Sequence, residues 1–245
     1  MKLYGLIGFP LAHSFSKKYF DNKFEDEQIL NCSFSNFEIP QIIHIISLIQ
    51  QNPALQGFAI TIPYKQQIIP YLNFATDDVK QMSACNCVKI VDGKLHGYNT
   101  DIIGFEKSFT PLLQMHHEKA LVLGTGGAAK AVIFTLKKLG INYLSVSRNK
   151  LADSIIYDDL NEALMEEYSI IINTTPLGTY PKIDTCSNIP YQFITKQHYC
   201  FDLVYNPTLT KFLQLAQKQN ATIKNGYDML TIQAEENWKI WNSNK

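Results

Sequence analysis

The sequence predicts an α/β protein with two domains. Three observations support this prediction. Apolar, strand-like runs alternate with helical patterns along the whole chain, which is typical of sheets that are mainly parallel. A glycine-rich turn begins in mid-chain, at residue 124, between an apolar run and an apolar helical pattern. The 245 residues are enough to bury the cores of two modest domains.

The first half of the chain is expected to form one α/β domain with a mixed or parallel sheet. Strand-like runs lie at residues 2–7, 33–38, 57–61 and 87–91. Residues 40–51 place apolar side chains at helical spacing, and residues 105–118 are expected to form a connecting helix that ends in polar residues.

The second half repeats the alternation. Strands are expected at residues 120–123, 143–147, 169–173, 199–202 and near 221–224. Their spacing fits a Rossmann-type, doubly wound nucleotide domain. The tail, residues 229–241, has an amphipathic helical pattern, and we expect Trp238 and Trp241 to pack on one of its faces.

Composition excludes several classes of function. Lys plus Arg and Asp plus Glu number 22 each, so no overall field favours a nucleic acid or a membrane surface. The five cysteines are an odd, scattered set, and Cys85 and Cys87 are too close together for a zinc-binding pair. We therefore expect free thiols, no metal and a cytoplasmic protein. No apolar run approaches the roughly 20 residues of a membrane span.

The glycine-rich turn, GTGGAA at residues 124–129, follows a strand and opens a helix. In this context the first glycine allows a tight turn, and the second lets backbone approach a pyrophosphate. The small third residue, Ala129, lets the helix pack closely on the sheet. Bare N–H groups and the positive end of the helix dipole then hold the phosphates. We expect a dinucleotide to be bound by Gly124, Gly126, Gly127 and Ala128.

The residues after the next strand indicate which dinucleotide is bound. An NAD site usually has Asp or Glu at this point, where the carboxylate binds the ribose hydroxyl. Here the strand runs into Ser147, Arg148, Asn149 and Lys150. A hydroxyl and two cations suit a 2′-phosphate, so NADP is the expected cofactor. The alternative is that Arg148 and Lys150 are ordinary surface cations.

Two ionisable residues are candidates for proton transfer. Pro63 is expected to begin a helix whose first turn holds Lys65. The helix dipole disfavours a positive charge there, which makes the amine a candidate acid or base. Asn99 or Thr100 can cap the next helix and place Asp101 at its start, where a carboxylate is stabilised. Taken singly, the two residues are more simply a surface lysine and a helix-start acid.

The loop after the first strand, at residues 8–16, carries the hydroxyl groups of Ser14 and Ser16. Hydroxyl groups can donate hydrogen bonds to a small carboxylate. The alternative is that they cap the helix expected from Lys17 onward.

These segments together resemble the shikimate dehydrogenase family along nearly the whole chain. Residues 8–16 resemble its substrate-carboxylate loop, and residues 57–65 and 97–104 its segments with the catalytic lysine and aspartate. The glycine-rich turn and residues 147–150 resemble its NADP-binding segments. Similar segments also lie at residues 172–178, 202–207 and 226–233. Departures from the family pattern are Lys17 for proline, Cys87 for threonine, Ser147 for asparagine and Thr179 for methionine.

The resemblance implies an NADP-dependent oxidoreductase acting on a CH–OH group. Its reaction would be the reversible reduction of 3-dehydroshikimate to shikimate in the shikimate pathway of aromatic amino-acid biosynthesis. Lys65 and Asp101 would be catalytic, and which of them moves the proton stays open. Substrate would be bound by Ser14, Ser16, Thr61, Asn86, Tyr205 and Gln233. Thr174 and Gly226 would join the cofactor site.

The resemblance also implies which part of the chain binds the substrate and which part binds the cofactor. Residues 1–101 with 229–245 would form the substrate-binding and catalytic domain, and residues 102–228 the NADP-binding Rossmann domain. The main alternative is a paralogue that oxidises quinate, alone or with shikimate, using NAD or NADP. A methylene-tetrahydrofolate dehydrogenase and a non-catalytic nucleotide-binding protein are disfavoured. Small molecules are the expected partners, and both a monomer and a homodimer stay open.

Overall fold

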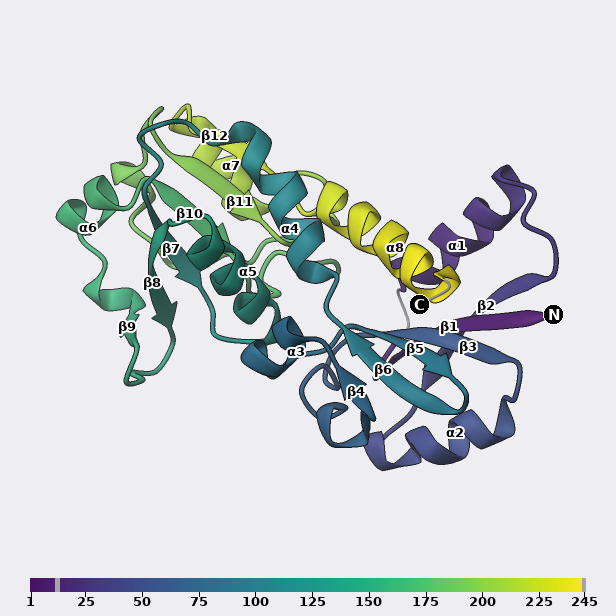
Figure 1. The fold of residues 1–245 in the computed structure, drawn as a ribbon. Helices are drawn as coiled ribbons and strands as arrows, with labels where there is room; N and C mark the ends of the chain where they lie inside the picture. Colours follow the sequence, from purple (N-terminus) through teal and green to yellow (C-terminus); the bar gives the residue numbers. More distant parts are fainter. Residues whose placement is uncertain (12–13, 244–245) are drawn as a thin grey trace. The chain divides into compact units, whose positions relative to one another are not determined.

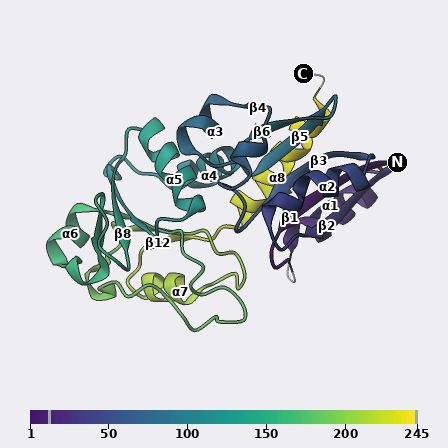
Figure 2. The same ribbon diagram turned by 90° about the horizontal axis from the view of Figure 1, so that it is seen from below.

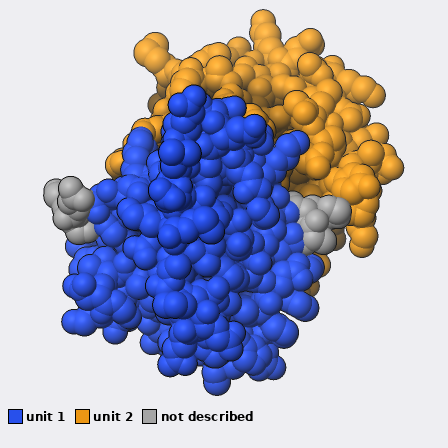
Figure 3. Space-filling model, turned by 90° about the vertical axis from the view of Figure 1, so that its right-hand side faces the viewer, with its two compact units in different colours: residues 1–100, 234–245 blue, residues 101–233 orange. Residues whose placement is uncertain are grey.

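The computed structural model describes residues 1–11 and 14–243. The chain forms two compact units, residues 1–100 with 234–245 and residues 101–233 (Figure 3). Each unit is built on its own six-stranded sheet. Relative to the expected division, Asp101 and residues 229–233 lie in the second unit. No helix within the described ranges is both long and apolar enough to span a bilayer.

The first unit contains a mixed sheet. Its strands are β1 (Lys2–Gly8), β2 (Cys32–Glu38), β3 (Leu55–Ile60), β4 (Phe74–Ala75), β5 (Cys87–Val91) and β6 (Lys94–Tyr98). They are ordered β2-β1-β3-β5-β6-β4. β1 pairs in parallel with β2 and β3, whereas β5 is antiparallel to β3 and β6.

Helices cover both faces of this sheet (Figure 1). They are α1 (Phe15–Asp26), α2 (Ile45–Gln51), α3 (Asp77–Met82) and the end of α8 (Tyr227–Asn242). Alternate residues of β1 face opposite sides. Leu6 packs with α1 and α8, and Ile7 packs with α2 and α3.

The second unit contains an entirely parallel sheet. Its strands are β7 (Lys119–Leu123), β8 (Asn142–Ser147), β9 (Ser154–Ile156), β10 (Ile170–Asn173), β11 (Tyr199–Asp202) and β12 (Thr222–Lys224). They are ordered β12-β11-β10-β7-β8-β9. Counted from β7, this is the 3-2-1-4-5-6 order of a doubly wound Rossmann domain. The predicted fold class is therefore confirmed.

Four helices flank this sheet: α4 (Asp101–Phe109), α5 (Gly127–Lys138), α6 (Glu162–Glu167) and α7 (Lys211–Lys218). Val122 of β7 packs with α4 and α5, and its neighbour Leu123 packs with α6 and α7. Figure 2 shows α5 and α7 on opposite sides of the strands. Short 3₁₀ helices lie at Ile42–His44, Ile69–Tyr71, Thr110–Leu112, Tyr157–Asp159 and Tyr191–Phe193.

Two helix predictions were wrong. Residues 62–68 form turns rather than a helix that begins at Pro63, and the carbonyl of Lys65 accepts a hydrogen bond from the N–H of Cys85 at 2.8 Å instead of continuing a helical ladder. The predicted helix at 105–118 is α4, which ends at Phe109. Pro111 lacks the N–H that would bond back into that helix, and the proline also restricts the residue before it.

Candidate active site

The carboxyl ends of β1 and β3 lie side by side and bring two candidate segments together. Thr61 donates its N–H to the carbonyl of Ile7 at 2.9 Å, and Phe9 donates its N–H to the carbonyl of Ile62 at 3.1 Å. The loop that leads to Ser14 therefore begins beside the segment that carries Thr61.

Two further segments reach the same edge because β5 runs antiparallel to its neighbours. Ile60, at the end of β3, donates its N–H to the carbonyl of Asn86 at 2.8 Å. Asn86 in turn donates its N–H to the carbonyl of Tyr98, the last residue of β6, at 3.2 Å. Thr100 follows that strand end, so four segments meet at one edge of the first sheet.

The side chain of Asn86 is buried at this edge and holds Thr100. Its Oδ1 accepts the backbone N–H of Thr100 at 2.7 Å, and its Nδ2 donates to Thr100 Oγ1 at 3.0 Å. Asn86 is 2% exposed and Thr100 is 1% exposed. Asn99 donates its amide N–H to the carbonyl of Ala84 at 2.9 Å. Both residues that we expected to cap α4 are thus engaged with this neighbouring loop.

Lys65 is half-buried and lies in the turns after β3. Because no helix begins at Pro63, the helix-dipole argument for this amine does not apply. The backbone bond from Cys85 instead ties Lys65 to the residue that precedes Asn86. Tertiary hydrogen bonding, rather than a helix, therefore positions Lys65.

Ser14 stands at the N-cap position of α1, yet its side chain makes no capping bond. Its hydroxyl oxygen is buried and has no hydrogen-bond partner within residues 1–11 and 14–243. A buried hydroxyl without a partner is costly, so this donor suits a ligand better than the cap that was the alternative. Ser16 is also buried, in the first turn of α1. Residues 12–13 of the predicted loop lie outside the described residues.

The remaining substrate and catalytic candidates belong to the second unit. Asp101 is buried as the first residue of α4, which confirms its expected position at a helix start. Tyr205 follows β11, and burial raises the pKa of its phenol. Gln233 lies on α8, where its amide donates to the carbonyl of Leu230 at 3.0 Å.

The glycine-rich turn lies at the switch point of the second sheet, where the loops after β7 and β10 are neighbours. Gly124 has a φ of +104°, a conformation that glycine adopts readily. A Cβ on it would lie 2.8 Å from Thr174 Oγ1. That hydroxyl donates to the carbonyl of Leu123 at 2.7 Å, so the β10 loop is closely packed on the turn.

The start of α5 offers open backbone. Gly126 is the N-cap, and a Cβ on it would have nothing within 4 Å among the residues described. Gly127 and Ala128 form the first turn of this helix. Ala129 is 1% exposed and packs in the core against the sheet. An open helix N-terminus with small residues fits the pyrophosphate of a dinucleotide.

In the segment after β8, one candidate side chain is part-buried and the other two are exposed. The hydroxyl of Ser147 is part-buried, donates to the carbonyl of Asn149, and lies 2.9 Å from Ser154 Oγ. Arg148 and Lys150 are exposed. The serine therefore shapes the loop, while the two cations face solvent.

Gly226 is buried between β12 and α8. A Cβ on it would lie 2.1 Å from the carbonyl oxygen of Leu203. Close packing against that backbone accounts for this glycine.

Two polar groupings were not predicted from the sequence. One joins the ends of β10 and β11, where Asn173 Nδ2 donates to Asp202 Oδ1 at 2.8 Å. Burial raises the pKa of Asp202 to about 6. Both residues are fully buried. The available signal was a polar residue at the end of each of two otherwise apolar strands.

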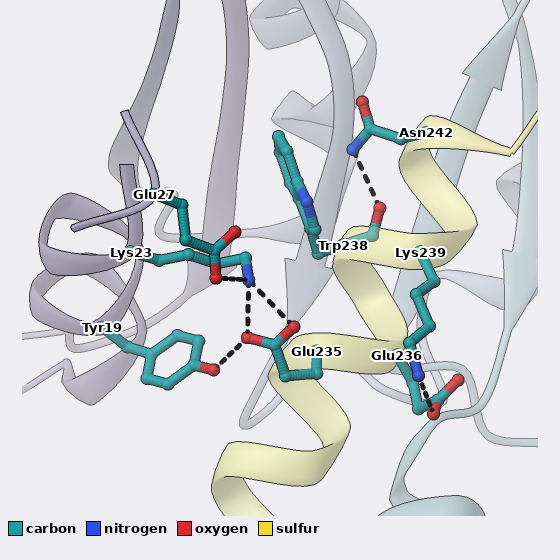
Figure 4. A network of polar contacts seen from close by, with 8 residues as sticks. All are labelled: Tyr19, Lys23, Glu27, Glu235, Glu236, Trp238, Lys239 and Asn242. Carbon is teal, nitrogen blue, oxygen red and sulfur yellow. Dashed lines mark hydrogen bonds and ion pairs between the residues drawn. The ribbon is translucent and has the colours of Figure 1, made fainter. Parts of the chain in front are cut away.

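The second grouping ties α8 to α1 (Figure 4). The Tyr19 hydroxyl donates to Glu235, and the Lys23 ammonium contacts Glu235 at 2.9 Å and Glu27 at 2.6 Å. The two carboxylates raise the pKa of Lys23 despite the opposing effect of its burial. Helix α1, whose N-cap is Ser14, is thus held by charges as well as by packing.

No cluster of three or more His, Cys, Asp or Glu side chains suited to a metal occurs in the described part of the chain. None of the five cysteines is in a disulfide.

Comparisons with known proteins agree on one family. The model described as the shikimate dehydrogenase substrate binding domain matches residues 6–88. The shikimate dehydrogenase (NADP(+)) of Clostridium beijerinckii is 38% identical over 98% of this chain and 92% of that protein. The crystal structure of shikimate dehydrogenase from Aquifex aeolicus is 33% identical and superposes with a TM-score of 0.87, covering 99% of this chain and 92% of that one.

A third relative was solved with ligands. Shikimate 5-dehydrogenase from Thermus thermophilus, in complex with NADP(H) and shikimate, is 26% identical, with a TM-score of 0.87 over 99% of this chain and 94% of that one. Similarity at this level extends through both units. The chain therefore belongs to the shikimate dehydrogenase family.

Proposed function

We propose that this protein catalyses the reversible, NADPH-dependent reduction of 3-dehydroshikimate to shikimate in the shikimate pathway. The observation that carries the proposal is the near full-length similarity to NADP-dependent shikimate dehydrogenases. The buried hydroxyl of Ser14, which has no hydrogen-bond partner among the residues that the structure describes, supports it, because that hydroxyl is a donor suited to a substrate carboxylate.

In this proposal, residues of the second unit bind the cofactor. Gly124, Gly126, Gly127 and Ala128 hold the pyrophosphate at the start of α5. Arg148 and Lys150 contact the 2′-phosphate, and Ser147 shapes their loop. Thr174 and Gly226 complete the surroundings of the dinucleotide. When bound, NADPH supplies the hydride.

In this proposal, residues at the edge of the first sheet bind the substrate. Ser14 and Ser16 donate to the carboxylate. Thr61 and Asn86 hold ring hydroxyls, and Tyr205 and Gln233 are the further residues that we assign to substrate binding. Because Asn86 is oriented by Thr100, its amide is preorganised for this purpose.

Lys65 and Asp101 manage the proton. Reduction of a ketone to an alcohol needs one hydride and one proton, and the ammonium of Lys65 delivers the proton to the reacting oxygen. Asp101 fixes the amine and accepts a hydrogen bond from the adjacent hydroxyl. In the reverse direction the Lys65 amine takes the proton back.

The proposal includes action in the cytoplasm. Five cysteines without a disulfide are typical of a protein from a reducing compartment.

Initial rates test the proposal directly. Purified protein is offered shikimate or quinate, each with NADP or NAD, and the nicotinamide absorbance is followed. Turnover with shikimate and NADP far above the other three combinations is expected. Preferred turnover of quinate would assign the chain to the quinate-oxidising paralogue. Intact NADPH binding without turnover of either substrate would contradict an enzymatic role on these compounds.

A further inference from the structure

We propose that Asn237 is a positioning residue for substrate binding, acting through the hydroxyl of Thr100 on the amide of Asn86. Asn237 lies on α8, far in sequence from both of the residues through which it acts. The inference rests on the proposed function, in which Asn86 binds a ring hydroxyl.

Three side chains form a buried chain of hydrogen bonds. Thr100 Oγ1 donates to Asn237 Oδ1 at 2.7 Å and accepts from Asn86 Nδ2 at 3.0 Å. Asn237 and Thr100 are each 1% exposed, and Asn86 is 2% exposed. With so little exposure, water cannot substitute readily for any member of the chain.

The single hydroxyl proton of Thr100 decides the arrangement. It can go to Asn237 Oδ1 at 2.7 Å or to Asn86 Oδ1 at 3.2 Å. The Asn86 oxygen already accepts the backbone N–H of Thr100 at 2.7 Å. When the Thr100 hydroxyl donates its hydrogen bond to Asn237 Oδ1, a lone pair of Thr100 Oγ1 is directed at Asn86 Nδ2. Asn237 thereby keeps Thr100 Oγ1 available as the acceptor for Asn86 Nδ2.

A flipped Asn86 amide would be unfavourable in this setting. Its NH₂ group would face the backbone N–H of Thr100, and two donors cannot bond to each other. One N–H and one lone pair of the amide are used by Thr100, and the plane of the amide is set by those two bonds. A substrate hydroxyl then meets an amide whose orientation has already been selected, which lowers the entropic cost of binding.

Packing and a hydrogen bond of α8 hold Asn237 in place. Ala234, Asn237 and Trp241 are buried at helical spacing on one face of α8. Trp241 donates its indole N–H to the carbonyl of Val88 in β5 at 3.0 Å, which pins the helix to the sheet. Burying an asparagine side chain among apolar residues is costly unless the side chain is hydrogen-bonded. The bond from Thr100 helps to offset that cost, and we take orienting Thr100 to be the role of Asn237.

Substitutions at Thr100 and Asn237 test the inference in the full chain. We expect Thr100→Val and Asn237→Ala each to raise KM for shikimate about 5- to 30-fold, the effect of losing one buried hydrogen bond. KM for NADP should change less than about twofold, since neither residue lies in the second unit. Thr100→Ser keeps the hydroxyl and should restore the wild-type KM for shikimate.

The double variant shows whether the two residues act through one path. In Thr100→Val with Asn237→Ala, KM for shikimate should rise no further than in Thr100→Val alone, because Thr100→Val already removes the bond that Asn237→Ala removes. Independent effects that multiply would overturn the inference. Thr135→Val is the matched control: its hydroxyl is also buried and donates to the carbonyl of Ala131, at 3.0 Å. It should leave KM for shikimate unchanged.

The remaining outcomes are separable. Equal increases of both KM values would indicate general destabilisation and overturn the positioning role. If Asn237→Ala does not fold, as judged by thermal melting, the contrast between Thr100→Val and Thr100→Ser decides. Wild-type protein that does not turn over shikimate contradicts the proposed function instead. Wild-type turnover with an unchanged KM in Thr100→Val contradicts this inference alone.

Discussion

The amide of Asn173 donates a 2.8 Å hydrogen bond to the carboxylate of Asp202, joining the ends of β10 and β11. Asn173 Oδ1 in turn accepts from the N–H and the hydroxyl of Thr175, at 3.1 and 2.7 Å. The next residue back, Thr174, bonds to the carbonyl of Leu123 at the start of the glycine-rich turn. A buried carboxylate therefore supports the loop that packs on the proposed cofactor site.

Asp202 should make stability depend on pH. Burial raises its pKa to about 6 in the folded protein, above the roughly 3.9 of an unfolded aspartate. The folded state therefore binds the proton more tightly, and this contribution to stability is fully present below about pH 4 and lost as pH rises through about 6. Relative to Asp202→Asn, the wild-type protein should gain about 1 kcal/mol between pH 7.5 and pH 5. Urea unfolding of both proteins at the two pH values measures this, and a difference that does not vary with pH would contradict it.

His198 should act in the opposite direction. Burial lowers the pKa of its imidazole, whose Nδ1 accepts the N–H of Thr195 at 3.0 Å while Nε2 lies 2.8 Å from the carbonyl of Met165. Because the unfolded chain binds the proton more tightly, this contribution is present above about pH 6.5 and lost as pH falls below it. His198→Gln should be less stable at pH 8 and show a shallower acid-side loss. Melting curves from pH 5 to pH 8 test this, and parallel profiles would exclude the assignment.

Lys65→Ala should lower kcat by about 10²- to 10⁴-fold, the usual contribution of general acid–base catalysis. KM for NADP should stay the same, because the amine acts on the substrate oxygen. Lys80→Ala is a control, since Lys80 is an exposed lysine paired with Asp77 on α3. Steady-state kinetics of both variants make the comparison. Retention of full kcat in Lys65→Ala would remove Lys65 from the mechanism.

Gly124→Ala should raise KM for NADP by about 10- to 100-fold, because a displacement of the turn misplaces the pyrophosphate. The new Cβ would meet Thr174 Oγ1 at 2.8 Å. Gly140→Ala provides the control: Gly140 also has a positive φ, of +72°, but no described atom lies within 4 Å of its added Cβ. It should lose stability through backbone strain and keep its KM for NADP. Equal KM values in the two variants would show that packing of the turn does not control binding.

Arg148→Ala combined with Lys150→Ala should reduce the preference for NADP over NAD. Charge-assisted bonds to a phosphate are worth roughly 1.5–3 kcal/mol, so we expect the ratio of the two kcat/KM values to fall about 10- to 100-fold. The activity with NAD is an internal control and should change little. An unchanged ratio would mean that both residues are ordinary surface cations.

Much of the architecture could be predicted from periodicity. The apolar runs that became β1, β3, β5, β7 and β10 were recognisable because burial on both faces needs continuous apolar residues. The strand–turn–helix around Gly124 was recognisable because it needs glycine at fixed spacing. Local patterns also marked Lys65, Asp101, Ser14 and Ser16 as candidates, but the roles of the substrate and catalytic residues came from resemblance to a family and stay predictions.

Local pattern could not reveal bonds between distant residues. Pro63 follows the rule for a helix start, yet the carbonyl of Lys65 is engaged by Cys85 and the segment forms turns. In the sequence, Asn237 is simply an asparagine within an amphipathic pattern. Only folding brings Thr100 Oγ1 to 2.7 Å from Asn237 Oδ1. The sequence by itself determined the alternation of elements, the fold class and the glycine-rich turn, because these depend on neighbouring residues. Tertiary structure alone decided the orientation of the Asn86 amide, the backbone hydrogen bond that holds Lys65, and the burial that raises the pKa of Asp202. Each of these depends on partners that only folding brings together.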